Sequence, residues 1–303
     1  MGFDRLHRRD VLKLIGASAV AAGFPGALRA EPAAAPKGVA FIEGASGKIA
    51  YRQSTGTGRA IILVHGNSMS SRSFVRQLDG PLGQKRRLIA IDLPGHGESA
   101  NATGDTVYNL PGYARTVVDL AKRLGVEDAV FAGHSLGGHI VLEAAPNLPK
   151  AAGFVVFGTP PLAFPPAMDK AFLPNPAMNV GFAGEITKEQ AQAYLASWFK
   201  PGTTDIAPSF LDDLMRTDGR ARTQLGASIV PDGYRDEIEV VAKLKQPLAV
   251  LHGADDQLIN GGYFASLTMP TLWRGSVQTI ANSGHTPQWE QAAQFDALID
   301  AFG

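Results

Sequence analysis

The sequence predicts an α/β fold, in which a doubly wound, mostly parallel sheet carries helices on both faces. Short, near-continuous apolar runs recur along the chain, and such runs suit strands that are buried on both faces. Helical patterns fall between most of these runs, and this alternation is typical of a parallel sheet with crossover helices. The chain has 303 residues, 45% of them hydrophobic, which is enough for one large α/β domain or two small ones.

The first 35 residues differ in kind from the rest, and we interpret residues 1–35 as an export signal and linker. Arg8 and Arg9 precede a modestly apolar run over residues 14–28, after which small residues and prolines follow. The arginine pair resembles the twin-arginine signal of bacteria, so we expect an exported, periplasmic or secreted protein that engages the twin-arginine export machinery transiently. The run is too short and too rich in Gly and Ala for a stable membrane span. The alternative, an amphipathic helix on the domain, is disfavoured by the Pro-Ala linker.

The predicted strands begin at Gly38. Residues 38–43 and 48–53 alternate like the two strands of a hairpin. Apolar runs then predict six buried strands, at residues 59–65, 88–92, 129–132, 153–157, 248–252 and 276–281. Helical patterns are found at residues 108–124, 136–148 and 287–302.

The alternation is interrupted once, after the fourth buried strand. Residues 159–245 contain no apolar strand run but many prolines and short helical patterns, one of which begins with a capping box at Thr187 and Gln190. An insertion of this length is typical of a lid. We therefore expect residues 36–158 and 246–303 to form the core and residues 159–245 to form a helical lid. The aromatic residues of the lid either pack its own small core or line an apolar substrate pocket.

A serine stands between two glycines where the third buried strand passes into a helix, in the stretch Gly133-His134-Ser135-Leu136-Gly137. A turn this tight leaves no room for a Cβ at the flanking positions, and glycine removes the clash. The free N–H groups of the helix then face whatever the hydroxyl attacks. This is the nucleophile-elbow pattern G-x-S-x-G, which makes Ser135 the candidate nucleophile. An ordinary glycine-serine turn is the alternative, so the partners of the serine decide.

Two later strand ends supply these partners, because the catalytic groups of such a sheet collect at the carboxyl ends of its strands. His285 follows the sixth strand and is the candidate general base for Ser135. Asp255 and Asp256 follow the fifth strand and compete to orient the imidazole. The turn that starts at Gly253 favours Asp256, and geometry decides between the two. The order Ser, Asp, His along the chain is the one that this kind of fold requires.

The end of the first buried strand predicts an oxyanion hole. Gly66 lets the backbone bend toward a substrate, so the N–H of Asn67 is one expected donor. The N–H of Leu136, directly after the serine, is the second. The alternative is a plain strand-to-helix turn that a nearby serine caps.

Composition removes several classes of function. The chain has no cysteine, which excludes disulfides, thiolate metal sites and cysteine nucleophiles. Its 28 Lys and Arg balance its 28 Asp and Glu, so no nucleic-acid partner is indicated. The seven histidines lack metal-site spacing, and we expect neither a metal nor another cofactor. Asp92 is expected to stabilise a turn, and His134 and His139 to flank the serine on the wrong sides of its turn.

Together these motifs resemble those of the α/β-hydrolase fold superfamily, in its serine hydrolase branch with a Ser-Asp-His triad. The matching motifs run from His65-Gly66, through residues 92–99 and the elbow, to Gly284-His285, and so span nearly all of the chain after the signal. The resemblance implies catalysis by Ser135, Asp256 and His285, with the lid placed after the fourth buried strand. A serine at the elbow speaks against the haloalkane dehalogenase and epoxide hydrolase branches, which use a carboxylate nucleophile.

The sequence therefore predicts a carboxylesterase-like serine hydrolase that cleaves an ester or related acyl bond of a small, apolar substrate. The reaction would pass through an acyl-enzyme on Ser135. Lactonase, aminopeptidase, carbon–carbon hydrolase and perhydrolase activities use the same triad and stay open at this point. A non-catalytic module that binds a small ligand in the lidded pocket is the rival from another class.

Overall fold

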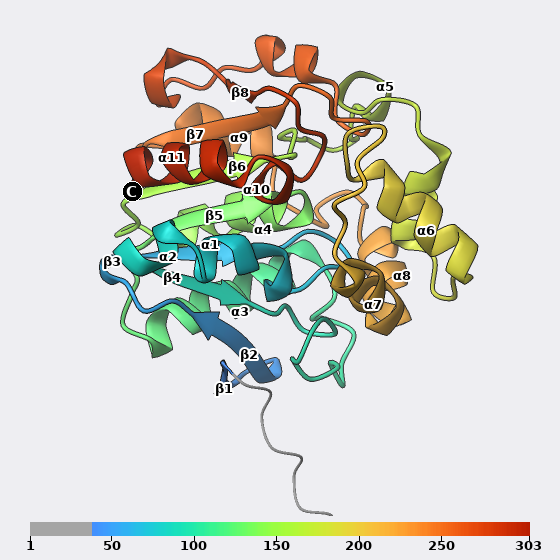
Figure 1. Ribbon diagram of the computed structural model, residues 1–303, viewed down its shortest axis with the longest axis horizontal. Coiled ribbons are helices and arrows are strands. Elements are labelled where there is room, and N and C mark those ends of the chain that lie inside the picture. The colour runs from blue at the N-terminus through green and yellow to red at the C-terminus, as the bar shows by residue number, and fades with distance from the viewer. Residues whose placement is uncertain (1–37) are drawn as a thin grey trace, which may run out of the picture. The chain divides into compact units, whose positions relative to one another are not determined.

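An eight-stranded sheet runs through the computed structural model, which describes residues 38–303 (Figure 1). The strand order is β1-β2-β4-β3-β5-β6-β7-β8. The pairs β1–β2 and β2–β4 are antiparallel, and every other pair is parallel, which confirms the predicted doubly wound, mostly parallel sheet. The predicted export signal lies outside the described residues. The strands are β1 (Val39–Gly44), β2 (Gly47–Gln53), β3 (Thr57–Val64), β4 (Arg86–Ile91), β5 (Val130–His134), β6 (Gly153–Phe157), β7 (Leu248–Gly253) and β8 (Gln278–Ile280).

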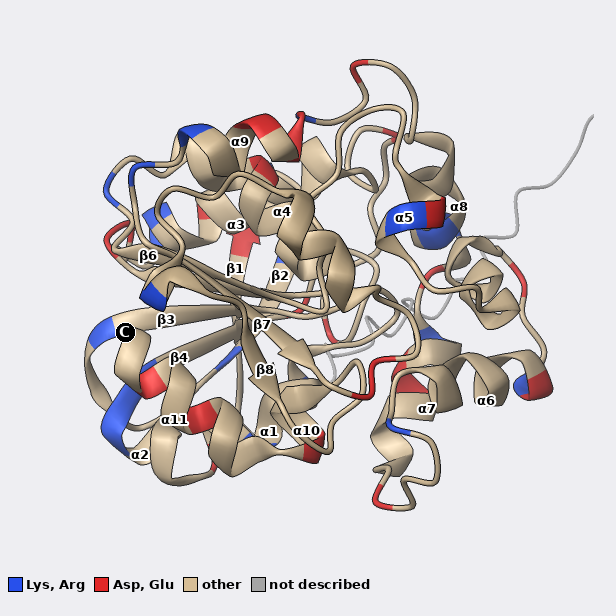
Figure 2. Cartoon of the chain, turned by 90° about the horizontal axis from the view of Figure 1, so that it is seen from above, with Lys and Arg blue, Asp and Glu red and all other residues tan. Residues whose placement is uncertain are grey.

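Helices cover both faces of the sheet (Figure 2). One face carries α3 (Leu110–Arg123), α4 (Leu136–Ala144) and α9 (Glu237–Lys243). The other carries α1 (Val75–Leu78), α2 (Pro81–Lys85), α10 (Pro287–Glu290) and α11 (Ala292–Phe302).

The apolar runs form strands because both faces of each strand are covered. In β3, Ile62 and Val64 pack into the core on the α3 and α4 side. Ile61 and Leu63 pack into the opposite core, which also contains Phe295 of α11. Each fully buried side chain of this size contributes about 1.5–3 kcal/mol, so two-sided burial stabilises the central strands strongly.

The predicted helix over residues 287–302 is two helices, and the prediction of a single one is wrong. Gln291 separates α10 from α11, because its φ of −130° and ψ of 51° lie outside the helical region. The carboxylate of Glu290, just before the break, accepts hydrogen bonds from the N–H groups of Lys200 (2.7 Å) and Gly284 (2.8 Å). These contacts tie α10 to its surroundings and not to the continuation of α11.

The segment of residues 159–245, which we term the lid, contains several short helices beside the carboxyl ends of the parallel strands (Figure 1). The capping box of α6 is confirmed: Thr187 Oγ1 accepts from the N–H of Gln190, and Gln190 Oε1 accepts from the N–H of Thr187. The last helix, α9, packs against α4. The helices of this segment that have not been introduced are α5 (Met168–Ala171), the 3-10 helix η3 (Pro176–Phe182), α6 (Lys188–Ser197), α7 (Pro208–Arg216) and α8 (Gly219–Ala227).

The lid has an aromatic core of its own. The ring of Phe210 meets those of Trp198, Phe199 and Trp289 edge to face, with centroids 4.9 to 6.4 Å apart. Trp289 belongs to α10, so this cluster also fastens the lid to the core. Within residues 38–303, no helix has the length and apolar character needed to cross a membrane.

Candidate active site

Ser135 occupies the strand-to-helix turn between β5 and α4 in a strained conformation. Its φ is 50° and its ψ is −119°, a region that residues other than glycine rarely adopt. Such strain costs about 1–3 kcal/mol and tends to occur at functional sites. The flanking glycines are required for space: a Cβ on Gly133 would lie 2.2 Å from the carbonyl oxygen of Gly137, and one on Gly137 would lie 2.2 Å from that of Val64.

Hydrogen bonds to the neighbouring strand hold this elbow in place. The N–H of Ser135 donates to the carbonyl oxygen of Phe157, at 2.8 Å. The hydroxyl of Thr159 donates to the carbonyl oxygen of Ser135, at 2.9 Å. The serine backbone is therefore fixed on both sides, while its side chain is left to face a pocket.

The imidazole of His285 meets the carboxylate of Asp256. His285 Nδ1 lies 2.9 Å from Asp256 Oδ2, and the residues are 3% and 8% exposed. Asp256 Oδ1 accepts from the N–H groups of Leu258 (2.8 Å) and Ile259 (3.1 Å), so all of its hydrogen bonds fix one orientation. Asp255 points elsewhere, 3.9 Å from Lys200 Nζ and near the surface. Of the two competing carboxylates, the structure thus places Asp256 against the histidine.

Charge and hydrogen bonding decide the protonation state of this pair. Burial by itself raises the pKa of Asp256, but the adjacent His285 imidazole and the two backbone N–H groups outweigh it and lower that pKa below its ordinary value. An ionised Asp256 requires that His285 Nδ1 carry the proton it shares with the carboxylate. The other ring nitrogen, Nε2, then keeps its lone pair when the ring is neutral, as a general base requires.

Two neighbours fix the position of His285. Gly158, directly after β6, has a φ of 59°, and a Cβ there would lie 2.8 Å from Cε1 of the imidazole. His134 Nε2 donates to the carbonyl oxygen of His285 at 2.7 Å. Burial lowers the pKa of His134 well below its ordinary value, so its ring is neutral. His134, excluded as a base by its position in the sequence, therefore supports the backbone of His285.

Ser135 and His285 line one pocket, together with Asn67 and Leu136. The empty volume of the pocket, its mouth included, is about 900 Å³. The structure thus brings the five predicted site residues to one place, with Asp256 behind His285. Apart from a few polar groups the wall is apolar, and it is formed by Leu110, Leu162, Pro166, Met168, Phe172, Met178, Phe182, Leu225, Ile229, Leu258 and Ile259.

The lid aromatics divide between the two roles that the sequence left open. Phe172, Phe182 and Tyr194 line the pocket. Trp198, Phe199 and Phe210 lie in the aromatic core of the lid instead. The pocket wall is therefore made largely by the lid.

The backbone segment that carries Asn67 is tied to the lid. Asn67 Nδ2 donates to the carbonyl oxygen of Gly181, in η3, at 2.7 Å. Ser68 Oγ donates to Asn67 Oδ1 at 3.0 Å. Leu136 is the first residue of α4, so its N–H has no acceptor within the helix. Asn67, in the turn after β3, and Leu136, at the start of α4, thus both line the pocket.

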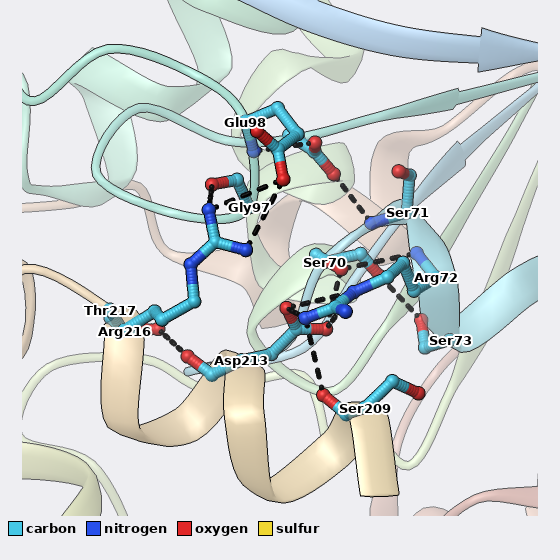
Figure 3. A network of polar contacts seen from close by, with 11 residues as sticks. Ser70, Ser71, Arg72, Ser73, Gly97, Glu98, Ser209, Asp213, Arg216 and Thr217 are labelled. Atoms are coloured by element: carbon cyan, nitrogen blue, oxygen red, sulfur yellow. Dashed lines mark hydrogen bonds and ion pairs between the residues drawn. The ribbon is translucent and has the colours of Figure 1, made fainter. Parts of the chain in front are cut away.

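A polar network beside this segment joins lid and core (Figure 3). Ser70 Oγ donates to Asp213 Oδ2, in α7, at 2.6 Å, and Arg72 forms an ion pair with the same carboxylate. On the core side, Asp92 accepts from the N–H groups of Ser71 (2.6 Å) and Glu98 (2.9 Å). The structural role expected for Asp92 matches this arrangement.

The sequence left the role of Tyr194, one of the lid aromatics, open, and it did not assign His139 or Glu237 to the pocket. Tyr194 comes from α6, and no local pattern announces where the lid places it. Burial raises the pKa of Tyr194 to about 12, so its hydroxyl stays protonated and able to donate. His139 and Glu237 also line the pocket and pair with each other. His139 stands in the first turn of α4, four positions after the nucleophile elbow residue Ser135, and this proximity in the sequence was the available signal.

No group of three or more His, Asp or Glu side chains that would hold a metal ion is found in residues 38–303. The arrangement on hand consists of a hydroxyl, an imidazole backed by a carboxylate, backbone donors and an apolar cavity. These parts are those of nucleophilic acyl transfer.

Comparison with known proteins gives a consistent result. Residues 61–298 match the model of the Alpha/beta hydrolase family. The solved structure of N-acyl homoserine lactonase AidH, complexed with N-butanoyl homoserine, is 34% identical over 87% of this chain and 95% of that one, with a TM-score of 0.83. Pimeloyl-[acyl-carrier protein] methyl ester esterase of Xylella fastidiosa is 27% identical over 83% of this chain and 98% of its own length. The dihydrolipoyllysine-residue acetyltransferase component of the acetoin cleaving system of Cupriavidus necator is 27% identical over 89% of this chain and 69% of its own length. With the fold and the family model in agreement, the chain belongs to the alpha/beta hydrolase family.

Proposed function

We propose that the protein is a serine hydrolase that opens the ester bond of lactones bearing an apolar acyl chain. One observation carries the proposal: Ser135 and the His285–Asp256 pair stand at a pocket whose wall is otherwise almost entirely apolar. A hydroxyl, a base and backbone donors are what an ester carbonyl needs, and the apolar wall suits a hydrocarbon chain.

The reaction would proceed by acyl transfer. Ser135 Oγ attacks the ester carbonyl while His285 Nε2 takes its proton, and Asp256 stabilises the resulting imidazolium. The N–H groups of Asn67 and Leu136 stabilise the negative charge on the carbonyl oxygen. The carbon–oxygen bond to the leaving alcohol then breaks, and that oxygen takes the proton from His285. Water, deprotonated by the same nitrogen, releases the acid and restores the serine.

Two observations favour a cyclic ester over an open one. The similarity to N-acyl homoserine lactonase AidH extends over nearly the whole of both chains. Tyr194 and Asn67 both line the pocket, and their polar groups lie near each other, since a Cβ on Gly181 would lie 2.7 Å from the Tyr194 hydroxyl and 3.2 Å from Asn67 Nδ2. Polar side chains in the pocket suit a compact, polar lactone ring, and the apolar wall suits its acyl tail.

Hydrolysis of N-butanoyl and N-hexanoyl homoserine lactone tests the proposal, with ring opening followed by chromatography. We expect turnover that Ser135→Ala abolishes, and one fluorophosphonate adduct on Ser135 that His285→Ala strongly weakens. If the protein hydrolyses p-nitrophenyl esters but does not open the lactones, the lactone specificity is refuted and the serine ester hydrolase activity is retained. A protein that is neither labelled nor active on any ester would be a binding module.

We also propose that the protein is exported, on the basis of Arg8, Arg9 and the apolar run that follows them. Twin-arginine export moves proteins that have already folded. Because this chain has no cysteine, it can fold completely before export without needing an oxidising compartment to form disulfides. Cell fractionation tests this: the Arg8→Lys, Arg9→Lys double variant should accumulate as precursor in the cytoplasm. An unchanged distribution between the fractions would contradict it.

A further inference from the structure

A second imidazole–carboxylate pair lies in the pocket, apart from the one at His285. His139 Nδ1 lies 2.9 and 3.0 Å from the two carboxylate oxygens of Glu237. Glu237 is 1% exposed, and its Oε2 also accepts from the N–H of Leu162 at 2.8 Å. Both members of the pair line the pocket, in a wall that is mainly apolar.

The hydrogen bonds of this pair set the role of each ring nitrogen. Both oxygens of Glu237 face N–H donors, which is the environment of an ionised carboxylate. His139 Nδ1 therefore carries the proton that it directs at Glu237. In the neutral ring, Nε2 is then a hydrogen-bond acceptor with a free lone pair.

That lone pair is accessible from the pocket. Among residues 38–303, His139 Nε2 has no hydrogen-bond partner and is absent from the fully enclosed polar atoms. The side chain of His139 is 15% exposed, whereas that of Glu237 is 1% exposed. His139 lies in the first turn of α4, four residues after Ser135, which is the N-cap of that helix, and both residues line the same pocket.

A buried carboxylate costs free energy that an apolar pair of the same shape would avoid. The hydrogen bond from His139 Nδ1 to Glu237 is enough to hold α4 against the lid, and it leaves Nε2 without a structural role. We propose that His139 Nε2 accepts a hydrogen bond from an amide N–H of the substrate, and that Glu237 fixes the tautomer that makes this possible. The preferred substrates are then esters whose acyl part carries an amide N–H one carbon away from the scissile carbonyl.

This inference rests on the proposed function, because it assumes that the ester carbonyl lies at Ser135. With the carbonyl there, an amide on the adjacent carbon faces the pocket that Ser135 and His139 both line. The other polar atoms that bound this part of the pocket belong to Ser228 and Tyr234. Their hydroxyls donate to the carbonyl oxygens of Leu225 and Ala163 and keep lone pairs of their own. A neutral imidazole nitrogen is a stronger acceptor than a hydroxyl oxygen, which favours His139 Nε2.

The test compares two lactones of equal chain length, an α-acylamino-γ-butyrolactone and the α-(2-oxoalkyl)-γ-butyrolactone in which CH₂ replaces the N–H. The readout is the ratio of their kcat/KM values. His139→Asn is the informative variant, since its Nδ2 can still donate to Glu237 while no atom remains at the Nε2 position. Losing one hydrogen bond should lower the ratio by about 3- to 10-fold.

Two further variants separate recognition from a structural role. Glu237→Gln keeps the shape but lets an amide N–H face His139 Nδ1, which moves the proton to Nε2 and should lower the ratio as well. His139→Gln gives up the contact with Glu237 but returns an amide near the Nε2 position, and it should recover part of the ratio. An unchanged ratio, or an equal loss of kcat/KM for both lactones in His139→Asn and Glu237→Gln, would overturn the proposal.

A second substrate pair keeps this test independent of lactone opening. If the wild type opens neither lactone, the same ratio is measured for a p-nitrophenyl ester of an N-acylglycine against a p-nitrophenyl alkanoate of equal length. A fall of about 3- to 10-fold in His139→Asn then supports the amide contact although the lactone is refuted. An unchanged ratio, or a wild type inactive on all four esters, overturns it.

Discussion

Ser70, three residues after Asn67, donates a hydrogen bond of 2.6 Å to Asp213 of the lid helix α7 (Figure 3). Arg72 pairs with the same carboxylate, which is 2% exposed. Asn67 itself reaches the lid through its side-chain bond to Gly181. The backbone that is proposed to stabilise the oxyanion is therefore held by the lid as much as by the sheet.

Removing Asp213 should destabilise the protein and also slow the reaction. In Asp213→Ala the guanidinium of Arg72 and the hydroxyl of Ser70 lose a buried acceptor, which costs about 1–3 kcal/mol of unfolding free energy. The segment with Asn67 then becomes less well positioned, so kcat should fall. Urea unfolding and ester kinetics measure the two effects. Asp212→Ala, on the next and exposed residue of α7, is the control and should behave like the wild type. Equal behaviour of both variants would contradict the lid's supporting role.

The two adjacent aspartates should differ sharply in their effect on catalysis. Asp256→Asn keeps the shape of the pair but replaces the carboxylate that accepts from His285 Nδ1, so the histidine adopts the wrong tautomer and kcat falls by roughly 10³- to 10⁴-fold. Asp255→Asn removes only a loose, partly exposed contact with Lys200 and should leave kcat within about 2-fold of the wild type. Steady-state kinetics on one p-nitrophenyl ester decides, and comparable losses in both variants would remove Asp256 from its proposed role.

The parts of the site that the sequence could predict are those set by local backbone. The elbow around Ser135 needs glycines because carbonyl oxygens lie 2.2 Å from the missing Cβ atoms, and that demand leaves a visible pattern. The ends of β7 and β8 reach the same edge of the sheet, which brings Asp256 and His285 together. The topology of a parallel sheet thus converts positions in the sequence into proximity.

The parts of the site that the sequence could not predict depend on packing between segments that are distant in the sequence. His139 is close to Ser135 in the sequence, but its partner Glu237 is 98 positions away on α9. Tyr194 reaches the pocket only because the lid folds over the sheet. Likewise, the break at Gln291 follows from contacts of Glu290 with Lys200 and Gly284, which the apolar spacing of α11 does not reveal.

Gly158 should be required for catalysis because it makes room for His285. In Gly158→Ala, a Cβ would lie 2.8 Å from the imidazole, and the φ of 59° is unfavourable for alanine by about 1–2 kcal/mol. A displaced imidazole should lower kcat by about 100-fold. Gly125→Ala is the matched control, since its φ is 63° but no atom lies within 4 Å of the added Cβ. It should lose similar stability in thermal unfolding and keep its activity. Full activity in Gly158→Ala would disprove the steric argument.

Asp296 should make the protein less stable as the pH rises. Burial raises the pKa of Asp296 to about 6, although Gln77 Nε2 donates to its carboxylate at 2.9 Å. The ordinary value is 3.8, so between pH 4 and pH 6 the folded state holds a proton that the unfolded state has lost. Stability therefore falls across this range, and the penalty is complete above pH 6. Two units correspond to about 3 kcal/mol at most, and partial solvent access reduces this to about 1 kcal/mol.

Asp296→Asn should remove that penalty, because an asparagine oxygen still accepts from Gln77 without ever ionising. The variant should be more stable than the wild type at pH 8 and nearly equal to it at pH 4. Asp300→Asn, on the same helix, should show the opposite sign. Hydrogen bonds from Lys85 and then Arg86 lower the pKa of Asp300, so its contribution is present at neutral pH and is lost as the pH falls through that lowered value. Urea unfolding at a series of pH values separates the two. A gain at pH 8 in both variants would show that loss of negative charge on α11, and not the burial of Asp296, is responsible.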